Sequence, residues 1–512
     1  MSIGDSCEDP QSAGNGVCLR RRMNDQNGTQ VTSMSRELQD STSESRPSHC
    51  EHGEAAASVV TSRGRPKTVL MVDYYFPPLA GAGAQRTLGY LPHLARYGWE
   101  PIVLTVRSGD SNFHDASLLD RIPQSVDVQR TPSFEPFKVA RWLARPFTVG
   151  SRGNGFHQPM GLLEWTTRQM RSLEYWIFFP DRNVGWVPFA VARALRINQD
   201  RPLDLIYSTS TSISSHVVAH IVRTILRKPW VADFQDAWAG HPEHAARLFP
   251  SPVHASMARG LERIILRSAD HVIVTADPLR QTFEQQGEGT APRKVTVIPM
   301  GFDPTAFNQA RALPRSKFTI THFGSFYAAR SPEPFLNALG RCVREHAELS
   351  ENLEVLFLGT FDAALRQLAL STIDRWGLHN VVRLKGAVPY ETGVQLLVSS
   401  QILLLVGDPG EWHRTAIPAK LFEYLAAKAP ILALLPDGPA ADIIRAGDAG
   451  LIVPPDDVGA ICDAIWRLYR LTRLGQLRFR TNPDVIGRYA WLTLAGRLAS
   501  VFDETLSSHA SR

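Results

Sequence analysis

The fold is decided by the stretch TVLMVDYYFPPLAGAGAQR, residues 68–86. It opens with a short apolar run, which is typical of a buried parallel strand. Two prolines and a series of small residues follow, and they predict a loop whose backbone can approach a ligand closely. Leucines at helical spacing then predict a helix over 87–97, either kinked or started late by Pro92 and ended by Gly98. The stretch therefore predicts a strand, a ligand loop and a helix in succession.

The residues that follow continue this alternation and predict a parallel α/β domain. Further apolar runs predict strands over 101–106, 204–208, 230–238, 271–275 and 294–299. Open parallel sheets bind ligands at the carboxyl ends of their strands. Asp236 and His216 fall at such ends or at the start of the next helix, so both are candidate catalytic residues, and a structural role is the alternative for each. The glycines of 68–86 do not match the GxGxxG fingerprint, so this loop alone is a weak indication of a nucleotide site.

The second half of the chain repeats the pattern. Strands are expected over 318–323, 353–358, 381–385 and 401–406, with a loop at 324–332 and a helix over 334–345. Two such repeats predict an α/β protein with two Rossmann-like domains facing a cleft.

We divide the chain into four parts from these patterns. Residues 67–305 and 306–483 are the expected domains, and 484–512 a closing helix expected to pack back on the first domain. Residues 1–66 are rich in polar side chains and poor in large apolar ones. Burial in such a segment cannot offset the entropy lost on ordering, so we expect a disordered tail.

The stretch TAIPAKLFEYLAAKAP, residues 415–430, predicts a helix after Pro418 that leads into a buried strand. Lys420 and Glu423 are three residues apart, so they share a helix face near its N-terminus. A cation there is unfavourable for the helix dipole but well placed to hold an anion such as a phosphate. Glu423 can accept hydrogen bonds from a diol. The competing interpretation is a solvated Lys–Glu pair on an ordinary surface helix.

Composition narrows the class of protein. The 512 residues are 44% hydrophobic and 21% charged, with a net charge of +5 and a pI of about 9.0. Such mild basicity suits an anionic ligand or membrane surface, and with no nucleic-acid-binding motif it does not indicate nucleic-acid binding. Five cysteines without CxxC or Cys/His spacing indicate neither a disulfide framework nor a zinc site.

The sequence also gives an expectation for the cellular compartment of the protein. No apolar run is long enough to span a membrane, and the acidic first residues do not resemble a signal peptide. The cysteine usage suits a reducing cytosol. We therefore expect a cytoplasmic protein, with peripheral attachment to the inner face of the cell membrane left open.

Residues 130–196 differ in composition from the rest of the chain. They hold ten Lys or Arg against four Asp or Glu, with aromatic side chains interleaved. Basic and aromatic side chains together are typical of surfaces that bind an anionic membrane or a lipid-linked substrate. The alternative is that the aromatic side chains are core and the cations are ordinary surface.

Six loose motifs occur in a recognisable order. In the first half they are Tyr75–Pro78 with Gly81, Gly83 and Arg86, then Phe179–Asp181 with Trp186, then Asp233–Trp238. In the second half they are Val297–Pro299 with Gly301–Asp303, then 324–330, then Lys420 with Glu423. From about Thr68 to its end the chain resembles the GT-B glycosyltransferases of the large family 4 kind (glycosyl transferases group 1), which include enzymes of bacterial polysaccharide and glycolipid biosynthesis in the cell envelope.

The resemblance implies that the second domain binds a nucleotide sugar and the first binds a polysaccharide, lipid-linked or related acceptor. Arg330 and Lys420 would neutralise the diphosphate, and Glu423 would hold the ribose hydroxyls. The full set of candidate donor-binding residues is Gly81, Gly83, Gly324, Arg330, Val388, Lys420 and Glu423. The candidate catalytic residues are Arg330 and Lys420, together with Asp236 and His216 from their positions at strand ends. The implied reaction is hexosyl transfer with retention at the anomeric carbon, without a metal ion or a further cofactor.

The sequence departs from the family pattern at three positions. Thr415 stands where family members often carry a second glutamate, eight residues before Glu423 and near the transferred sugar. Lys428 stands where a glycine usually ends the helix, and Gln235 where arginine is common. The first departure leaves the sugar contact open.

Two other functions compete with sugar transfer. One is a GT-B sugar-nucleotide epimerase, which needs acid/base residues beside the sugar and no acceptor site. The other is a catalytically silent protein that binds a nucleotide sugar or a partner enzyme, and Thr415 is the residue that keeps this reading open.

Overall fold

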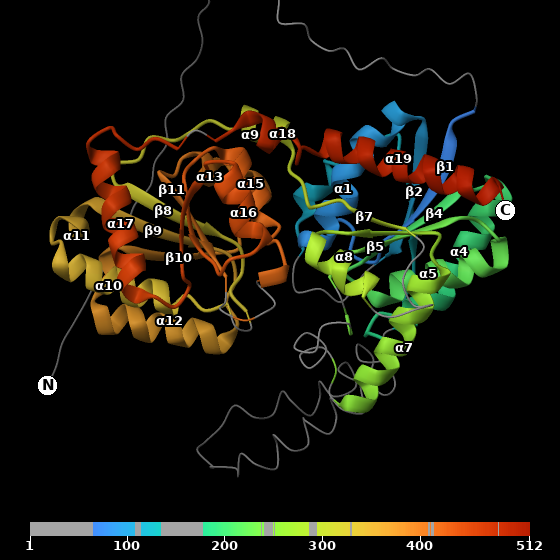
Figure 1. Cartoon of the computed structure of the whole chain (residues 1–512), viewed down its shortest axis with the longest axis horizontal. Coiled ribbons are helices and arrows are strands. Elements are labelled where there is room, and N and C mark those ends of the chain that lie inside the picture. The colour runs from blue at the N-terminus through green and yellow to red at the C-terminus, as the bar shows by residue number, and fades with distance from the viewer. Residues whose placement is uncertain are drawn as a thin grey trace, which may run out of the picture. The chain divides into compact units, whose positions relative to one another are not determined.

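The computed structural model describes residues 65–107, 114–134, 178–236, 238–239, 249, 251–285, 294–327, 330–407, 410, 414–479 and 481–511. These residues form two parallel sheets, each with helices on both faces (Figure 1). The predicted fold class, α/β with two Rossmann-like domains, is thus confirmed. The expected tail lies outside the described residues apart from Arg65 and Pro66, and so does the 135–177 part of the basic and aromatic segment 130–196.

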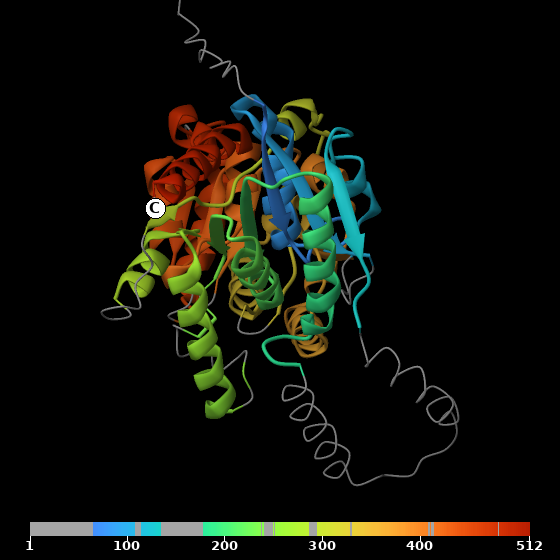
Figure 2. The same ribbon diagram turned by 90° about the vertical axis from the view of Figure 1, so that its right-hand side faces the viewer.

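The first sheet has seven parallel strands in the order β3-β2-β1-β4-β5-β6-β7. They are β1 (Lys67–Val72), β2 (Trp99–Val106), β3 (Asp127–Thr131), β4 (Leu205–Ser210), β5 (Trp230–Phe234), β6 (His271–Val274) and β7 (Val295–Val297). Sequence patterns missed β3, the cyan strand at the sheet edge in Figure 2. Its sequence, DVQRT, is polar because an edge strand is not covered on all sides as a central one is.

The second sheet has six parallel strands in the order β10-β9-β8-β11-β12-β13. They are β8 (Phe318–Phe323), β9 (Leu353–Leu358), β10 (Val382–Gly386), β11 (Ile402–Val406), β12 (Ile431–Leu434) and β13 (Gly450–Val453). In both sheets the chain first winds to one side of the opening strand and then crosses to the other. The switch points therefore lie between β1 and β4 and between β8 and β11, which is where open sheets of this kind bind ligands.

Helices cover both faces of the first sheet. They are α1 (Ala82–Leu94), α4 (Val187–Asp200), α5 (Ile213–Leu226), α7 (Pro252–Ser268), α8 (Asp277–Glu284) and, from the end of the chain, α19 (Trp491–Ala510). Helices α1 and α19 lie on one face of the sheet, and α4, α5 and α7 lie on the other (Figure 1). Apolar side chains of these helices form the core on each face.

The second sheet is covered in the same way. Its helices are α9 (Pro304–Gln309), α10 (Glu333–Glu345), α11 (Glu348–Asn352), α12 (Ala363–Trp376), α13 (Tyr390–Val398), α15 (Lys420–Ala427), α16 (Pro439–Ala446), α17 (Val458–Arg473) and α18 (Pro483–Gly487). A core with α10, α12 and α17 fills one face, and α13, α15 and α16 pack on the other.

The closing segment differs from its prediction, because it forms two helices, α18 and α19, instead of one. Between them the chain pairs with the segment that follows β7: Phe302 N donates to Tyr489 O, and Trp491 N donates to Phe302 O. The Trp491 ring then packs edge-on to Tyr90 and occupies space left by the missing side chain of Gly89. Helix α19 continues along the first sheet, where Phe502 packs on Trp99.

Helix α1 begins earlier than the sequence predicted. It starts at Ala82 and not at residue 87, and Pro92 lies inside it without ending it. Gly83 is therefore a helix residue, and a Cβ on it would come within 2.1 Å of Thr211 Oγ1. The small residues allow α1 to pack closely on the turn after β4, which the spacing of leucines does not reveal.

Helix α15 agrees with its prediction. Leu421, Tyr424 and Leu425 are fully buried. Lys428 ends the helix with a φ of 58°, in the left-handed region that favours glycine. Among the described residues no helix is long and apolar enough to cross a bilayer.

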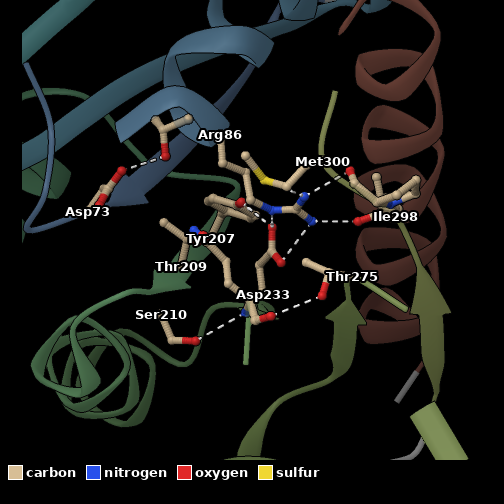
Figure 3. A network of polar contacts seen from close by, with 12 residues as sticks. Asp73, Arg86, Tyr207, Thr209, Ser210, Asp233, Thr275, Ile298 and Met300 are labelled. Carbon is tan, nitrogen blue, oxygen red and sulfur yellow. Dashed lines mark hydrogen bonds and ion pairs between the residues drawn. The ribbon is translucent and has the colours of Figure 1, made fainter. Parts of the chain in front are cut away.

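A buried arginine ties together distant parts of the first domain. Arg86 of α1 and Asp233 of β5 form a two-pronged ion pair, with N–O distances of 2.7 and 2.9 Å, and both side chains are fully buried (Figure 3). The same guanidinium donates to the carbonyls of Ile298 and Pro299, after β7. Burial is the largest single influence and lowers the pKa of Arg86, but Asp233, together with Tyr90 and Tyr207, has the larger combined effect, so the pKa is raised. Within the resemblance motif that contains it, Arg86 is therefore a structural residue in this chain.

Removing this arginine should destabilise the protein strongly. We expect Arg86→Met to lower the free energy of unfolding by about 3–5 kcal/mol, because Asp233 would be left as a buried, uncompensated charge. Arg280→Met is the matched control, since its pair with Asp277 is exposed and is expected to contribute less than about 1 kcal/mol. Urea unfolding followed by fluorescence measures both; equal losses would contradict the structural role of Arg86.

Candidate functional site

A cavity of about 1050 Å³ lies at the carboxyl ends of the strands. Segments that follow β1, β5 and β6 contribute to its wall, together with segments that follow β8, β9 and β10 and the start of α15. The sequence-predicted site residues that line it are Gly81, Asp236, Gly324, Arg330, Val388, Lys420 and Glu423. Gly83 and His216 are not among its lining residues.

Lys420 enters the cavity from the first residue of α15. Its Nζ lies 3.1 Å from Nε2 of His322, the residue before the end of β8. Burial lowers the pKa of Lys420 well below its ordinary value, and Arg330 lowers it further, whereas Glu423 acts in the opposite direction. An anion entering here would therefore meet a cation that has few other counter-charges.

Gly324 leaves the room that Lys420 occupies. Its φ of +135° is one that other residues rarely adopt, and a Cβ there would lie 2.6 Å from Lys420 Nζ. Gly324 thus allows the unusual backbone conformation of the loop and also leaves space for the Lys420 side chain. Arg330, at the other end of the same loop, lies over the ring of Tyr327 at 5.2 Å and lines the same cavity.

Glu423 lies one turn further along α15. Burial raises its pKa to about 7, and Arg121, Lys420 and a hydrogen bond from Tyr390 act against that rise. Tyr390 begins α13 and its ring lies 4.6 Å from the guanidinium of Arg121, which also donates to Gln85 at 3.0 Å. The carboxyl group is thus held between a tyrosine hydroxyl and two cations, and its oxygens can accept further hydrogen bonds.

The opposite wall carries a second carboxyl group. Asp236 follows β5 and lines the cavity, and burial raises its pKa to about 6. Its neighbour Gln235 donates to Thr209 Oγ1 at 3.0 Å and accepts from Thr275, so the loop after β5 is fixed to β4 and β6. Where family members commonly carry arginine, this chain thus has an uncharged side chain that holds the loop.

His216 does not reach the cavity, which corrects its placement at the ligand edge. It is fully buried in α5, where Nδ1 bonds Ser208 Oγ at 2.7 Å and the ring packs on Phe234 and Trp238. Burial lowers its pKa to about 3. The helix start lies at the predicted edge, but His216 is on the face that packs on β5. Gly83 is corrected in the same way, because its missing side chain makes room for Thr211 and not for a ligand.

Sequence reasoning missed His322, Tyr390 and Arg121. His322 lies inside the apolar run of β8, and a single histidine there has no distinguishing pattern. Tyr390 and Arg121 are far from each other and from Glu423 in the chain, so only folding brings them together. Thr415, the residue in place of an acid, does line the cavity. Among the described residues no group of three or more His, Cys, Asp or Glu is placed to hold a metal ion.

Comparison with known proteins identifies the protein family to which the chain belongs. Residues 81–301 match the family model described as glycosyl transferase 4-like domain, and residues 317–470 match that of glycosyl transferases group 1. The first match lies within the domain of the first sheet but begins after β1, and the second covers all six strands of the second sheet. The fold and the matches define a GT-B glycosyltransferase. The chain belongs to the family 4-like glycosyl transferases.

A curated relative is an exopolysaccharide phosphotransferase of Streptomyces coelicolor, 28% identical over 213 residues. The match covers 40% of this chain and 20% of that protein, so the chain spans about a fifth of the relative's length.

Solved structures share the fold over most of this chain. The sucrose-phosphate synthase of Thermosynechococcus elongatus has a TM-score of 0.57 at 14% identity, over 86% of this chain and 100% of that one. The trehalose 6-phosphate synthase of Burkholderia multivorans has 0.59 at 12%, over 88% and 98%. Anabaena HepE, solved in complex with UDP and glucose, has 0.56 at 17%, over 86% and 100%.

The raised pKa of Glu423 predicts a pH effect on stability. A carboxyl whose folded pKa lies at about 7, above its ordinary 4.5, favours folding at low pH and loses that contribution as pH rises through 7. Glu423→Gln cannot ionise, so its free energy of unfolding relative to wild type should rise between pH 4.5 and 7, by at most about 3 kcal/mol.

Denaturant unfolding at a series of pH values measures this difference, since all other titrating groups are common to both proteins. Glu391→Gln, which removes one carboxylate from the exposed first turn of α13, is the matched control. A difference that falls with pH would show that Glu423 is not held in a desolvated site.

Proposed function

We propose that this chain transfers a sugar, of the hexosyl type, from a nucleoside diphosphate sugar to a polysaccharide, lipid-linked or related acceptor. The observation that carries the proposal is the convergence of Lys420, Arg330 and Glu423 on one cavity at the switch point of the second sheet. In this arrangement the second domain holds the donor, and the wall formed by the first domain, including Asp236, faces the acceptor.

The charges of the site fit the chemistry of the leaving group. When the bond between the anomeric carbon and the phosphate oxygen breaks, negative charge grows on the diphosphate. Lys420 and Arg330 both line the cavity, and fixed positive charges aimed at the leaving group can stabilise the charge that develops there. Two fixed cations supply the positive charge that a divalent ion supplies elsewhere, so we propose a reaction without a metal ion.

The remaining contacts follow the shape of a nucleotide. Glu423 would accept hydrogen bonds from the ribose hydroxyls, and Val388, with Ala387 and Pro389, would form the edge that binds the base. Gly81 ends the loop after β1 with a φ of +131° and open space where a Cβ would stand, so its backbone can approach the transferred sugar. Support for a nucleotide ligand comes from HepE, which shares the fold and was solved with UDP and glucose.

Asp236 is proposed to act on the acceptor. A carboxyl group with a pKa of about 6 is able to exchange a proton near neutral pH, and it lies in the same cavity as the donor-site residues. It would orient the attacking hydroxyl and receive its proton. Retention at the anomeric carbon is proposed from family membership, and an exopolysaccharide-type acceptor is suggested by the Streptomyces relative.

A second candidate function is a silent nucleotide-sugar-binding protein. Thr415 favours it, because the cavity has a hydroxyl where many relatives carry an acid near the sugar. Sugar-nucleotide epimerisation is the other alternative. Incubation with donor alone identifies an epimerase, because only an epimerase changes the sugar. Hydrolysis of the donor, or transfer to an added acceptor, then separates a transferase from a silent protein, which does neither.

The site assignment is tested by removing each cation. Arg330→Ala and Lys420→Ala should each lower kcat/KM by about 10²–10³, because charge on the leaving diphosphate would go unstabilised. Lys428→Gly, at the other end of α15, is the matched control and should leave transfer unchanged while stabilising the fold by about 1 kcal/mol.

The donor is first identified by thermal stabilisation across a panel of nucleotide sugars, since bound ligand raises the apparent stability. Transfer or hydrolysis of that donor is then measured for each variant. Unchanged turnover in both alanine variants would overturn the assignment.

We also propose peripheral attachment to an anionic membrane surface through 130–196, on the composition of that segment. The protein should co-sediment with vesicles containing anionic lipid at low salt and be released at high salt, because screening weakens attraction between exposed charges. Vesicles of neutral lipid are the control. Absence of co-sedimentation at low salt would count against this attachment.

A further inference from the structure

His322 lies beside the cation at the start of α15. It lies in β8, is fully buried, and its Nε2 is 3.1 Å from Lys420 Nζ. The two residues are 98 positions apart in the chain, so the contact joins the first strand of the second domain to the helix at its switch point. A fully buried polar group that faces the cavity lysine needs an explanation beyond packing.

The protonation pattern of the imidazole follows from its second contact. Nδ1 lies 2.9 Å from the backbone carbonyl of Leu404 in β11. A carbonyl oxygen only accepts, so Nδ1 carries the hydrogen and donates it. Burial first, and then Lys420 and Arg330, lower the pKa of His322 well below its ordinary value, although the carbonyls of Leu404 and Gly324 act against this. The ring is therefore neutral, and the lone pair of Nε2 faces Lys420.

The surroundings prevent the ring from turning away. It stacks on Phe326 with ring centroids 4.3 Å apart, and Phe357 packs against its edge. Tyr424 of α15 also donates to Leu404 O at 3.2 Å and accepts from Phe323 N at 2.8 Å. The acceptor of the His322 hydrogen is thus held by the same helix that carries the lysine.

We propose that His322 is a positioning residue, a neutral imidazole that accepts a hydrogen bond from Lys420 and aims its amino group at the diphosphate. The inference rests on the proposed function, since it assigns a role in the same donor site. A carboxylate partner would orient the lysine equally well but would neutralise it and repel the ligand. The imidazole lone pair orients it and leaves its positive charge for the phosphate.

This arrangement also predicts proton uptake. The charged groups that face Lys420 are Arg330 and Glu423, with neutral His322. Burial and Arg330 lower the pKa of Lys420 in the free site, and both the ammonium and the amine can donate a hydrogen to Nε2. Entry of a diphosphate brings negative charge, which raises this pKa, so an amine that has lost its proton takes one up from solvent. Binding should therefore consume protons over the range in which the free lysine titrates.

The experiment compares wild type with His322→Phe, which keeps the stacked ring and removes the acceptor. Binding of UDP, GDP and ADP is measured by titration calorimetry in buffers of different ionisation enthalpy, which gives both affinity and proton uptake. For the diphosphate that wild type binds tightest, we expect at least tenfold weaker binding and a changed proton uptake in His322→Phe. His322→Gln retains an acceptor near the position of Nε2 and should recover part of the affinity.

His271→Gln is the matched control. This histidine is also nearly fully buried in a strand, where Nε2 contacts Thr296, and it does not line the cavity. The control should leave affinity and proton uptake unchanged even if it lowers stability. Equal affinity and equal proton uptake in wild type and His322→Phe would overturn the inference.

A readout without ligand separates this inference from the proposed function. The rate at which acetic anhydride modifies Lys420, followed by mass spectrometry over a pH series, reports the titration of its amine. Loss of the acceptor should move the midpoint to lower pH, because a hydrogen bond to Nε2 favours the charged form. An unchanged midpoint overturns the role of His322, whereas failure of wild type to bind any of the three diphosphates overturns the donor site itself.

Discussion

The structure depends on one constraint: in each parallel sheet the chain reverses its winding direction beside the opening strand. Neighbouring loops after β1 and β4, and after β8 and β11, then leave in opposite directions and open a crevice at the carboxyl edge. Gly81 and Gly324 follow the two opening strands directly or closely, and both line the cavity. The positions of the ligand loops are thus a consequence of strand order, and the chemistry is added by the few side chains that reach this edge.

Two buried cations in this protein illustrate opposite solutions to the cost of burying charge. Arg86 is fully matched, with a carboxylate and two carbonyls around its guanidinium, and it has nothing left to offer a ligand. Lys420 has a neutral imidazole beside it and Arg330 nearby, and Glu423 offsets them only in part, so its charge is incompletely compensated until an anion arrives. Full compensation suits a group that holds the fold, whereas incomplete compensation suits a group that binds a phosphate.

The predictions from sequence succeeded where burial imposes a pattern. Central strands such as β1 and β8 must be apolar on both faces, so their positions followed from the sequence nearly to the residue. The edge strand β3 carries no such pattern and was missed. The predictions that Gly83 and His216 reach the ligand site were wrong for another reason. The presence of Gly83 in the sequence does not show whether its missing side chain makes room for a ligand or for Thr211. A histidine near the start of a helix, such as His216, can likewise face either the cavity or the core.

The sequence by itself determined the fold class, the family and the helix that carries Lys420 and Glu423, because local hydrophobic periodicity and residue spacing specify strands, helices and their shared faces. Only the tertiary structure decided which polar side chains act together. His322 meets Lys420, and Arg121 meets Tyr390, across long stretches of chain. Such contacts depend on strand order and side-chain direction, which arise when the sheet assembles and leave no trace in local spacing.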